Sequence, residues 1–479
     1  METALVERNA KNVVDFGELP DIVWVEIMKL LTLEDRYHLS VCCRALYDAF
    51  NHPSLWHTVN ISLLGTSKYS NFNKGKVEVP HKYYELVKKF AHCFQDLTLK
   101  ICGDLHRLSE DWLDILMNLE SSGCYHLERL TLDVGQTKSK VGRIDAPPDT
   151  GGIYALLGFV RSATKLKSLV IQAWPLHQNL NCDKDIVTVI LENATFRNHL
   201  EMLSLYWPKK TDWVTKNGTV PTVKKTVELV NHLHAVQHLS LRSDMLHEDV
   251  INSLAKKDHA PMKRLEVLVI YCEHSNLAIP EIPSASWIAL KQQSPKLQVR
   301  CSVMTRTPAI ELAAMLKPEV PLVAIEFLKH SSCDSEVVLS LAAKYSQTLR
   351  TFMNFIDSTS GEASVSDNVL LALVERCQCL KYLVYHNSVH FLTVQRLSKM
   401  RRKDWEQFEF KEKAIVTQDL LSEEEEEENN DLVILQREPG MYVMRDFRRF
   451  HEDQDIRQSR LKATITTVCE NVGYNWLPL

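Results

Sequence analysis

Glycine is scarce in this chain, with 14 among 479 residues. Loops that cradle phosphate groups need closely spaced glycines, and neither G-x-x-x-x-G-K-S/T nor the nucleophile pattern G-x-S-x-G occurs. HExxH and paired CxxC spacings are missing as well. Without such spacings, the isolated ligand-type residues are expected to be ordinary core or surface residues: His232, His234, His330, Cys333 and His386. We therefore expect a protein with no cofactor, no metal site and no catalytic chemistry of its own.

Long apolar runs and an excess of basic charge are also missing. No run approaches the ~20 residues that span a bilayer, and METALVERNAKNVVDF lacks the basic-then-apolar order of a secretory signal. The twelve cysteines are therefore expected in a reducing compartment, mainly as small buried hydrophobes. The formal net charge of -5 supplies no global basic field for nucleic acid. These features predict a cytoplasmic and/or nuclear protein that binds neither membrane nor nucleic acid.

The segment FGELPDIVWVEIMKLLTLEDRYHLSVCCRALYDAFNHPSLW (16–56) predicts three short helices. Pro20 suits the first turn of the first helix, and Thr32 can cap the second. Asn51-His52-Pro53 ends the third, after which Trp56 is expected to pack back toward the rest of the chain. A unit of this size buries little surface, yet it carries more apolar positions than a single buried stripe. A partner chain is therefore expected to cover the excess.

This segment resembles an F-box, the helical module that docks on the Skp-type adaptor of cullin–RING ubiquitin ligases. The resemblance is carried by Leu19-Pro20, Ile27, Leu30-Leu31, Asp35, Leu39, Val41-Cys42-Cys43-Arg44 and Leu55-Trp56. Two positions depart from the family, with Arg36 where Leu is frequent and Leu46 where Trp is frequent. The resemblance implies an F-box over residues 15–60, after a flexible segment 1–14. It also implies a set of adaptor-binding residues: Leu19, Pro20, Ile27, Leu30, Leu31, Leu33, Asp35, Leu39, Val41 and Cys42.

A degenerate repeat of the form apolar-x-x-apolar-x-apolar follows, in eleven segments. They are residues 94–101, 126–134, 165–173, 199–207, 235–243, 264–272, 296–303, 321–329, 348–355, 379–386 and 404–411. The spacing of roughly 25–40 residues overlaps or exceeds that of leucine-rich repeats. Helical stretches that open with Ser or Asp lie between them, at 109–120, 183–194, 335–345 and 366–377. The predicted fold class is α/β: a small helical F-box, then a leucine-rich-repeat-like solenoid over 61–412 with parallel strands and helices on the convex side.

Within each predicted strand, alternate residues point in opposite directions. Leu127, Leu130 and Leu132 are expected in the core. The hypothetical substrate-binding surface consists of the strand residues that point away from the core and of three irregular inserts, at 135–152, 207–222 and 273–286. For the tryptophans near strand ends, including Trp287, packing and interface contact both remain open. The hypothetical substrate-binding residues are Gln172, Tyr206, Arg242, Tyr271, Glu326, His386, Trp207 and Trp213. The register around 297–303 and 349–355 is also left open.

The last part of the chain is polar and then apolar. Residues 413–432 are expected to form an acidic loop, because six consecutive glutamates repel one another. Residues 433–479 are apolar enough to cap the end of a solenoid. The basic cluster 399–403 fits a solvated helix face or a nuclear-import signal.

The order of an F-box and then irregular repeats resembles F-box-only proteins with cryptic repeats, the group that includes numbers thirty-three and thirty-nine, over residues 287–410. The resemblance implies a substrate-recognition subunit of an SCF-type E3 ubiquitin ligase. Its partners would be a Skp-type adaptor, a cullin and a RING subunit reached through that adaptor, and an unidentified protein substrate. A repeat-based scaffold that does not engage a cullin ligase is the alternative.

Overall fold

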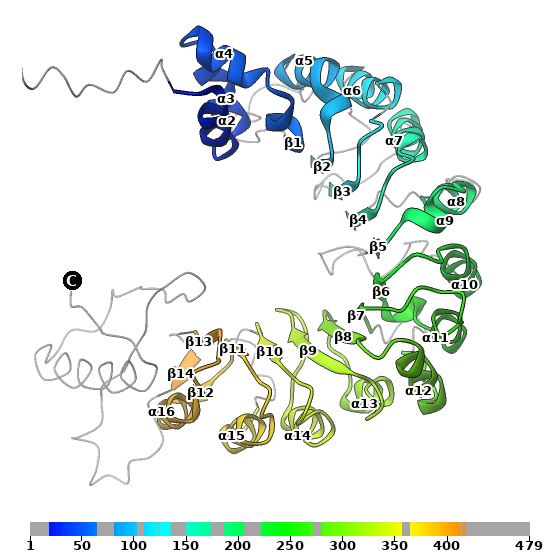
Figure 1. Ribbon diagram of the computed structural model, residues 1–479. Coiled ribbons are helices and arrows are strands. Elements are labelled where there is room, and N and C mark those ends of the chain that lie inside the picture. Colours follow the sequence, from blue (N-terminus) through cyan, green and yellow to red (C-terminus); the bar gives the residue numbers. More distant parts are fainter. Residues whose placement is uncertain are drawn as a thin grey trace, which may run out of the picture. The chain divides into compact units, whose positions relative to one another are not determined.

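The computed structural model describes the greater part of the chain (Figure 1). The described residues are 19–64, 81–102, 110–122, 124–135, 150–173, 186–205, 222–271, 279–356, 365–411 and 414–416. The predicted N-terminal segment 1–14, the C-terminal segment 433–479, most of the acidic loop and of the first two inserts, and residues 273–278 of the third insert lie outside them. Two compact units divide the chain, the first made mostly of residues up to His199 and the second mostly of residues from Leu200 onward.

The N-terminal module contains the three predicted helices. They are α2 (Asp21–Lys29), α3 (Leu33–Ser40) and α4 (Arg44–Phe50), followed by the short 3-10 helix η3 (Pro53–Trp56). Thr32 caps α3 as predicted: its Oγ1 accepts the Asp35 N–H at 3.2 Å and donates to Asp35 Oδ2 at 2.7 Å. Pro20 lies just before α2 rather than in its first turn, a difference of one position.

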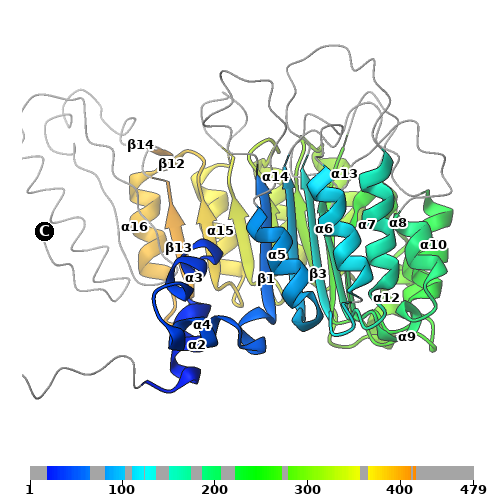
Figure 2. The same cartoon turned by 90° about the horizontal axis from the view of Figure 1, so that it is seen from above.

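In the first unit, parallel strands alternate with helices. The strands are β1 (Thr58–Leu64), β2 (Asp96–Cys102), β3 (Arg129–Gly135) and β4 (Ser168–Ala173), in sheet order, and residues Val170–Gln172 of β4 are assigned to the second unit. The helices are α5 (His81–Phe90), η5 (Ala91–Cys93), α6 (Glu110–Ser121), α7 (Thr150–Ser162), α8 (Ile186–Glu192) and α9 (Phe196–His199). Helices α5, α6 and α7 lie on one face of these strands (Figure 2). The register pairs Leu99 with Leu132, both fully buried, so the predicted inward positions are confirmed.

The second unit continues the same pattern. Its strands are β5 (Met202–Leu205), β6 (His238–Arg242), β7 (Arg264–Val269), β8 (Gln298–Val303), β9 (Leu322–Phe327), β10 (Thr351–Asn354), β11 (Tyr382–Tyr385) and β13 (Gln407–Phe410), neighbours in that order. The two-residue strands β12 (Val389–His390) and β14 (Ile415–Val416) pair separately. The helices are α10 (Val223–His232), η9 (Ser243–Met245), α11 (Glu248–Leu254), α12 (Ser284–Gln293), α13 (Ala309–Met315), α14 (Ser335–Lys344), α15 (Asp367–Arg376) and α16 (Phe391–Met400). Helices α13 to α16 line one side of the neighbouring strands (Figure 1).

Every one of the eleven predicted repeat segments contains a strand, which confirms the α/β fold with parallel strands. The segments 297–303 and 349–355, whose register the sequence leaves open, contain strands as well. A shift in the pairing of β8 with β9 occurs between Val299 and Arg300, where the leucine pattern is broken. In β10 the buried polar residue Asn354 replaces an apolar one, and its Oδ1 accepts the Ile356 N–H at 3.0 Å. Trp287 is buried within α12, so its role is packing.

Candidate functional site

The helical module exposes apolar side chains on a folded scaffold. Val25 and Met28 of α2 are completely buried, whereas Leu30 at the end of the same helix is 87% exposed. Val41, in the turn between α3 and α4, is 69% exposed. These two are joined by further exposed apolar or aromatic residues of the module: Ile22, Val23, Ile27, Tyr37 and Tyr47. The module thus has a buried core, and its exposed apolar side chains, together called the outer apolar face, are available to a partner.

The predicted adaptor-binding residues are all at least partly accessible. Six are exposed, namely Pro20, Ile27, Leu30, Asp35, Val41 and Cys42. Four are half-buried, namely Leu19, Leu31, Leu33 and Leu39. This placement is compatible with docking, and the individual contacts remain predictions.

Arg36, the first departure from the family pattern, is bound to the backbone inside the module. Its Nε donates to the carbonyl oxygens of Met28 at 2.8 Å and Leu31 at 3.2 Å. Its Nη2 donates to Lys29 O at 3.2 Å and its Nη1 to Leu55 O at 3.4 Å. Met28 O also accepts the Leu31 N–H at 3.1 Å, and the guanidinium adds its donors to the carbonyls at this end of α2 and ties that end to η3.

Arg36 also lies near the buried aromatic core, with its guanidinium carbon 5.9 Å from the Trp56 ring centre. Leu46, the second departure, is buried within the module. Neither departure therefore adds a residue to the outer apolar face. Sequence reasoning missed the role of Arg36, because only the fold brings the carbonyls of α2 around it.

Trp56 joins the module to the first repeat, as predicted. It is completely buried, packs against Phe90 at the end of α5, and donates its indole N–H to Phe50 O at 2.8 Å. Phe50 in turn lies edge-on to the indole. The module thus shares an aromatic core with the helix that follows β1.

The hypothetical substrate-binding residues have different surroundings. Gln172, Tyr271, Glu326 and His386 are half-buried on or just after strands, whereas Tyr206, Trp207 and Trp213 lie outside the described residues. Arg242 does not offer the expected open side chain: it is 4% exposed and bound to Asp244, with Nη2 2.7 Å from Oδ2 and Nε 3.0 Å from Oδ1. The 3-10 turn η9 after β6 folds Asp244 back onto it.

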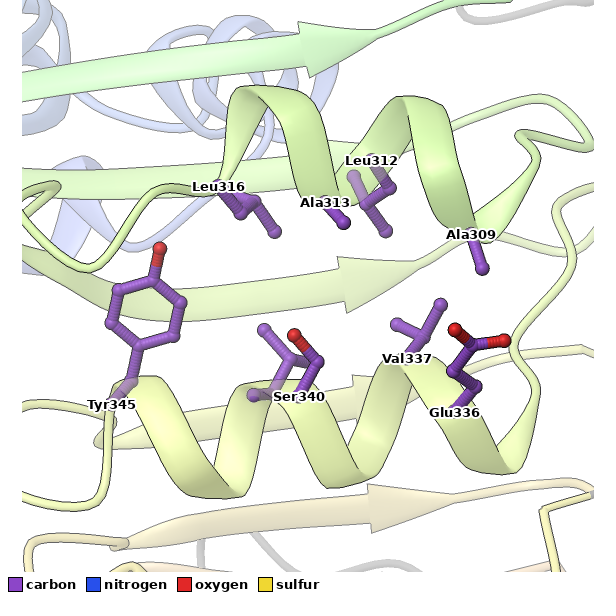
Figure 3. Close-up of a pocket in the computed structure, with 9 residues that line it drawn as sticks. Ala309, Leu312, Ala313, Leu316, Glu336, Val337, Ser340 and Tyr345 are labelled. Atoms are coloured by element: carbon purple, nitrogen blue, oxygen red, sulfur yellow. The ribbon is translucent and has the colours of Figure 1, made fainter. Parts of the chain in front are cut away.

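A shallow groove separates α13 from α14 in the second unit (Figure 3). It is lined by Leu312 of α13, by Leu316 just after that helix, and by Val337 and Ser340 of α14. Tyr345 lies at one end, where its hydroxyl donates to Lys317 O at 2.7 Å, and Glu336 lies at the other. Its lining has no nucleophile paired with a base, so the groove carries no catalytic arrangement.

In the part of the chain that the structure describes, no group of three or more His, Cys, Asp or Glu side chains is placed to hold a metal ion. No helix among the described residues is long and apolar enough to cross a membrane.

Residues 16–62 match the family described as F-box-like. The N-terminal module is therefore an F-box-like domain, called the F-box below. F-box/LRR-repeat protein 21 of Mus musculus is 23% identical over 314 residues, which cover 66% of this chain and 65%, just under two thirds, of that protein. The Ovis aries protein of the same name is 21% identical over 370 residues, 77% of this chain and 76% of that protein. Together with the repeated strands and helices, these matches are consistent with an F-box protein with leucine-rich repeats.

Among solved structures, the yeast "Rad7 and Elc1 complex" aligns over 93% of this chain and 97% of the matched chain. The sequence identity is 13% and the TM-score 0.38, so this likeness carries no argument about the F-box protein. The narrower resemblance of residues 287–410 to the thirty-three and thirty-nine group stays a prediction.

Proposed function

We propose that this F-box protein is the substrate-recognition subunit of an SCF-type E3 ubiquitin ligase. The F-box docks on a Skp-type adaptor, through which the chain meets the cullin and RING subunits, and the repeats hold a protein substrate. The chain supplies no chemistry. It acts by proximity, because a bound substrate meets the ubiquitin-charged enzyme at high effective concentration. The proposal places the protein in the cytoplasm, the nucleus or both.

The outer apolar face of the F-box carries this proposal. Leu30 and Val41 are large apolar side chains held in water by a module whose own core is already filled by Val25, Met28 and Trp56. Burying apolar area contributes about 25 cal/mol per Å², and a standard interface takes about 800 Å² per partner. A docked adaptor removes this exposed area without rearranging the module.

Adaptor capture by the purified full-length chain tests the proposal. Leu30→Asp places a charge in the docked face and is expected to abolish capture of a Skp-type adaptor while leaving the thermal unfolding midpoint nearly unchanged. Ile310→Asp is the matched control, because Ile310 on α13 is also a highly exposed apolar residue, at 78%. It is expected to retain capture. Failure of the wild-type chain to bind any Skp-type adaptor contradicts the proposal.

A second measurement distinguishes the ligase subunit from the alternative function, a scaffold that does not engage a cullin ligase. Cullin and RING subunits are expected to co-purify with the wild-type chain and to be lost together with the adaptor in Leu30→Asp. Adaptor binding without a cullin favours the scaffold. The placement of Arg36 and Leu46 within the module favours the ligase, because the two departures leave the outer face intact.

A further inference from the structure

Glu326 lies in a row of side chains that crosses the second-unit sheet. Its neighbours in β9, Ile325 and Phe327, are completely buried toward the helices, so Glu326 points to the opposite face. The register places Ser302 of β8 on one side of it and Met353 of β10 on the other. Continuing from Met353, the row reaches Val384 and then Glu409.

The half-buried Glu326 carboxylate has little hydrogen bonding for a group that is partly removed from water. Ser302 Oγ reaches Oε2 only at 3.4 Å, and no ion pair reaches this carboxylate among the described side chains. Burial raises the pKa of Glu326 and the nearby Glu266 adds to that shift, while Ser302 and Arg300 oppose it. A half-buried carboxylate in this position favours a cation that approaches from the open face.

Glu409 provides a second acid in the same row. Its Oε1 lies 2.9 Å from His386 Nε2, and its Oε2 accepts from Gln407 Nε2 at 2.9 Å. His386 is in edge-on contact with Phe355, with ring centroids 5.2 Å apart. The hydrogen bond to His386 is the main cause of a lowered pKa, so the Glu409 carboxylate is anionic at neutral pH.

Apolar side chains accompany the two acids. Met353 lies in the row between them, and Phe355, two residues further along the chain and just after the end of β10, is half-buried. Leu328, two residues beyond Glu326, packs on a buried cluster of Leu268, Ile270 and Met304. The face therefore combines two acids with the half-buried side chains of Met353 and Phe355, whereas Val384 between Met353 and Glu409 is buried.

We propose that this face receives an extended segment of the substrate protein in which lysine or arginine alternates with aliphatic or aromatic residues. The inference rests on the proposed function and narrows its substrate class. Cations meet Glu326 and Glu409, and apolar side chains cover Met353 and Phe355. An acidic segment is rejected, because two carboxylates would face it at close range.

The strand spacing sets the pattern of such a segment. Glu326 and Glu409 are three strands apart, which at about 4.8 Å per strand gives about 14 Å. An extended chain advances about 3.3 Å per residue, so two cations that meet the two acids are about four residues apart.

Selection of a random twelve-residue phage-displayed peptide library on the purified complex of full-length chain and adaptor tests the inference. The enriched peptides are expected to carry two basic residues about four positions apart, with Leu, Ile, Phe or Met between them. Glu326→Gln, which keeps the shape and removes the charge, is expected to weaken their binding at least tenfold. Glu409→Gln is expected to weaken it further, and rising salt to weaken it in the wild type.

Glu336→Gln is the matched control, because Glu336 is an exposed carboxylate on α14 and not on this sheet face. It is expected to bind the same peptides as the wild type. Enrichment of acidic peptides, enrichment that Glu326→Gln leaves unchanged, or no enrichment at all overturns the inference.

Adaptor capture, recorded in the same samples, keeps the two proposals apart. Glu326→Gln and Glu409→Gln are expected to retain the adaptor, because neither belongs to the F-box. A wild-type chain that captures adaptor but shows no basic–apolar preference contradicts only the substrate class. A wild-type chain that selects such peptides but captures no adaptor contradicts only the ligase proposal.

Discussion

Trp56 of the F-box stacks on Phe90 of the first repeat, with ring centroids 4.7 Å apart and an interplanar angle of 18°. Phe50 completes the contact with its ring edge 81° to the indole plane and centroids 4.9 Å apart. Because Trp56 is completely buried in this contact, the F-box and the first repeat share one core and are expected to unfold together.

Trp56→Ala is therefore expected to destabilise more than the F-box. Loss of a buried tryptophan costs about 3–5 kcal/mol. Urea unfolding followed by far-ultraviolet circular dichroism is expected to show an earlier transition with adaptor capture lost in the same range. In a double-mutant cycle with Phe90→Ala, the pair is expected to show a coupling of about 0.5–1.5 kcal/mol. Strict additivity of the two changes contradicts direct stacking.

The repeat fold could be predicted because its signal is both local and repeated. Strands such as β3 and β7 alternate apolar and polar residues, and eleven similar segments reinforce one another. Strand β1 was missed for a local reason: Val59 and Ile61 alternate correctly, but they directly follow the F-box and were assigned to it or to the next segment. The boundary predicted at residue 60 thus falls inside a strand.

The candidate sites were only partly predictable. The sequence alone predicts the exposure of Leu30, because the unit has more apolar positions than a module of its size can bury. The burial of Arg242 does not follow from alternation, because it depends on a turn that returns Asp244 to the guanidinium. The four carbonyls around Arg36 likewise come from α2, its C-terminal turn and η3, which only the folded chain brings together.

Arg36→Leu installs the residue that is frequent in the family, yet it is expected to destabilise this chain. Four carbonyl oxygens lose a charged donor; Met28 O keeps the Leu31 N–H and Lys29 O is exposed, so the expected loss is about 1–3 kcal/mol, from the partly buried hydrogen bonds to the charged group. Thermal unfolding of the full chain measures the loss. Arg44→Leu is the control, because the Arg44 side chain is 95% exposed with only a distant ion pair to Asp48, and it is expected to change stability little. Equal effects of the two substitutions contradict the role assigned to Arg36.

Glu326→Gln is expected to increase stability at neutral pH. Burial holds the pKa of Glu326 above its unfolded value, so the ionised carboxylate is less favourable in the folded chain than in the unfolded one. Below the unfolded pKa the group is neutral in both states, and this penalty is absent. The gain from Gln is therefore expected at pH 7 and is expected to vanish as the pH falls below about 4.5, near the ordinary glutamate value. Urea unfolding at several pH values checks it, and a gain that is equal at pH 4 and pH 7 contradicts the assigned penalty.

The N-termini of α14 and α15 differ in whether a side chain caps the helix. Ser335 and Ser366 open two of the predicted helical stretches and are residues that favour a helix N-cap, but Asp334 rather than Ser335 caps α14, with Oδ1 accepting the Val337 N–H at 2.9 Å. Ser335 Oγ instead accepts the Ser366 N–H at 2.8 Å, which links the two helix starts. Ser366 precedes α15 but makes no side-chain cap bond.

Asp334→Ala is accordingly expected to destabilise the chain by about 0.5–2 kcal/mol, because it removes both the cap bond and a negative charge at the helix N-terminus. Ser366→Ala is expected to change stability by much less, since the backbone N–H that bonds Ser335 remains. Urea unfolding of the two variants and of the wild type, monitored at one wavelength by circular dichroism, compares them directly. A larger loss for Ser366→Ala would mean that its hydroxyl, rather than the Asp334 carboxylate, stabilises this pair of helix starts.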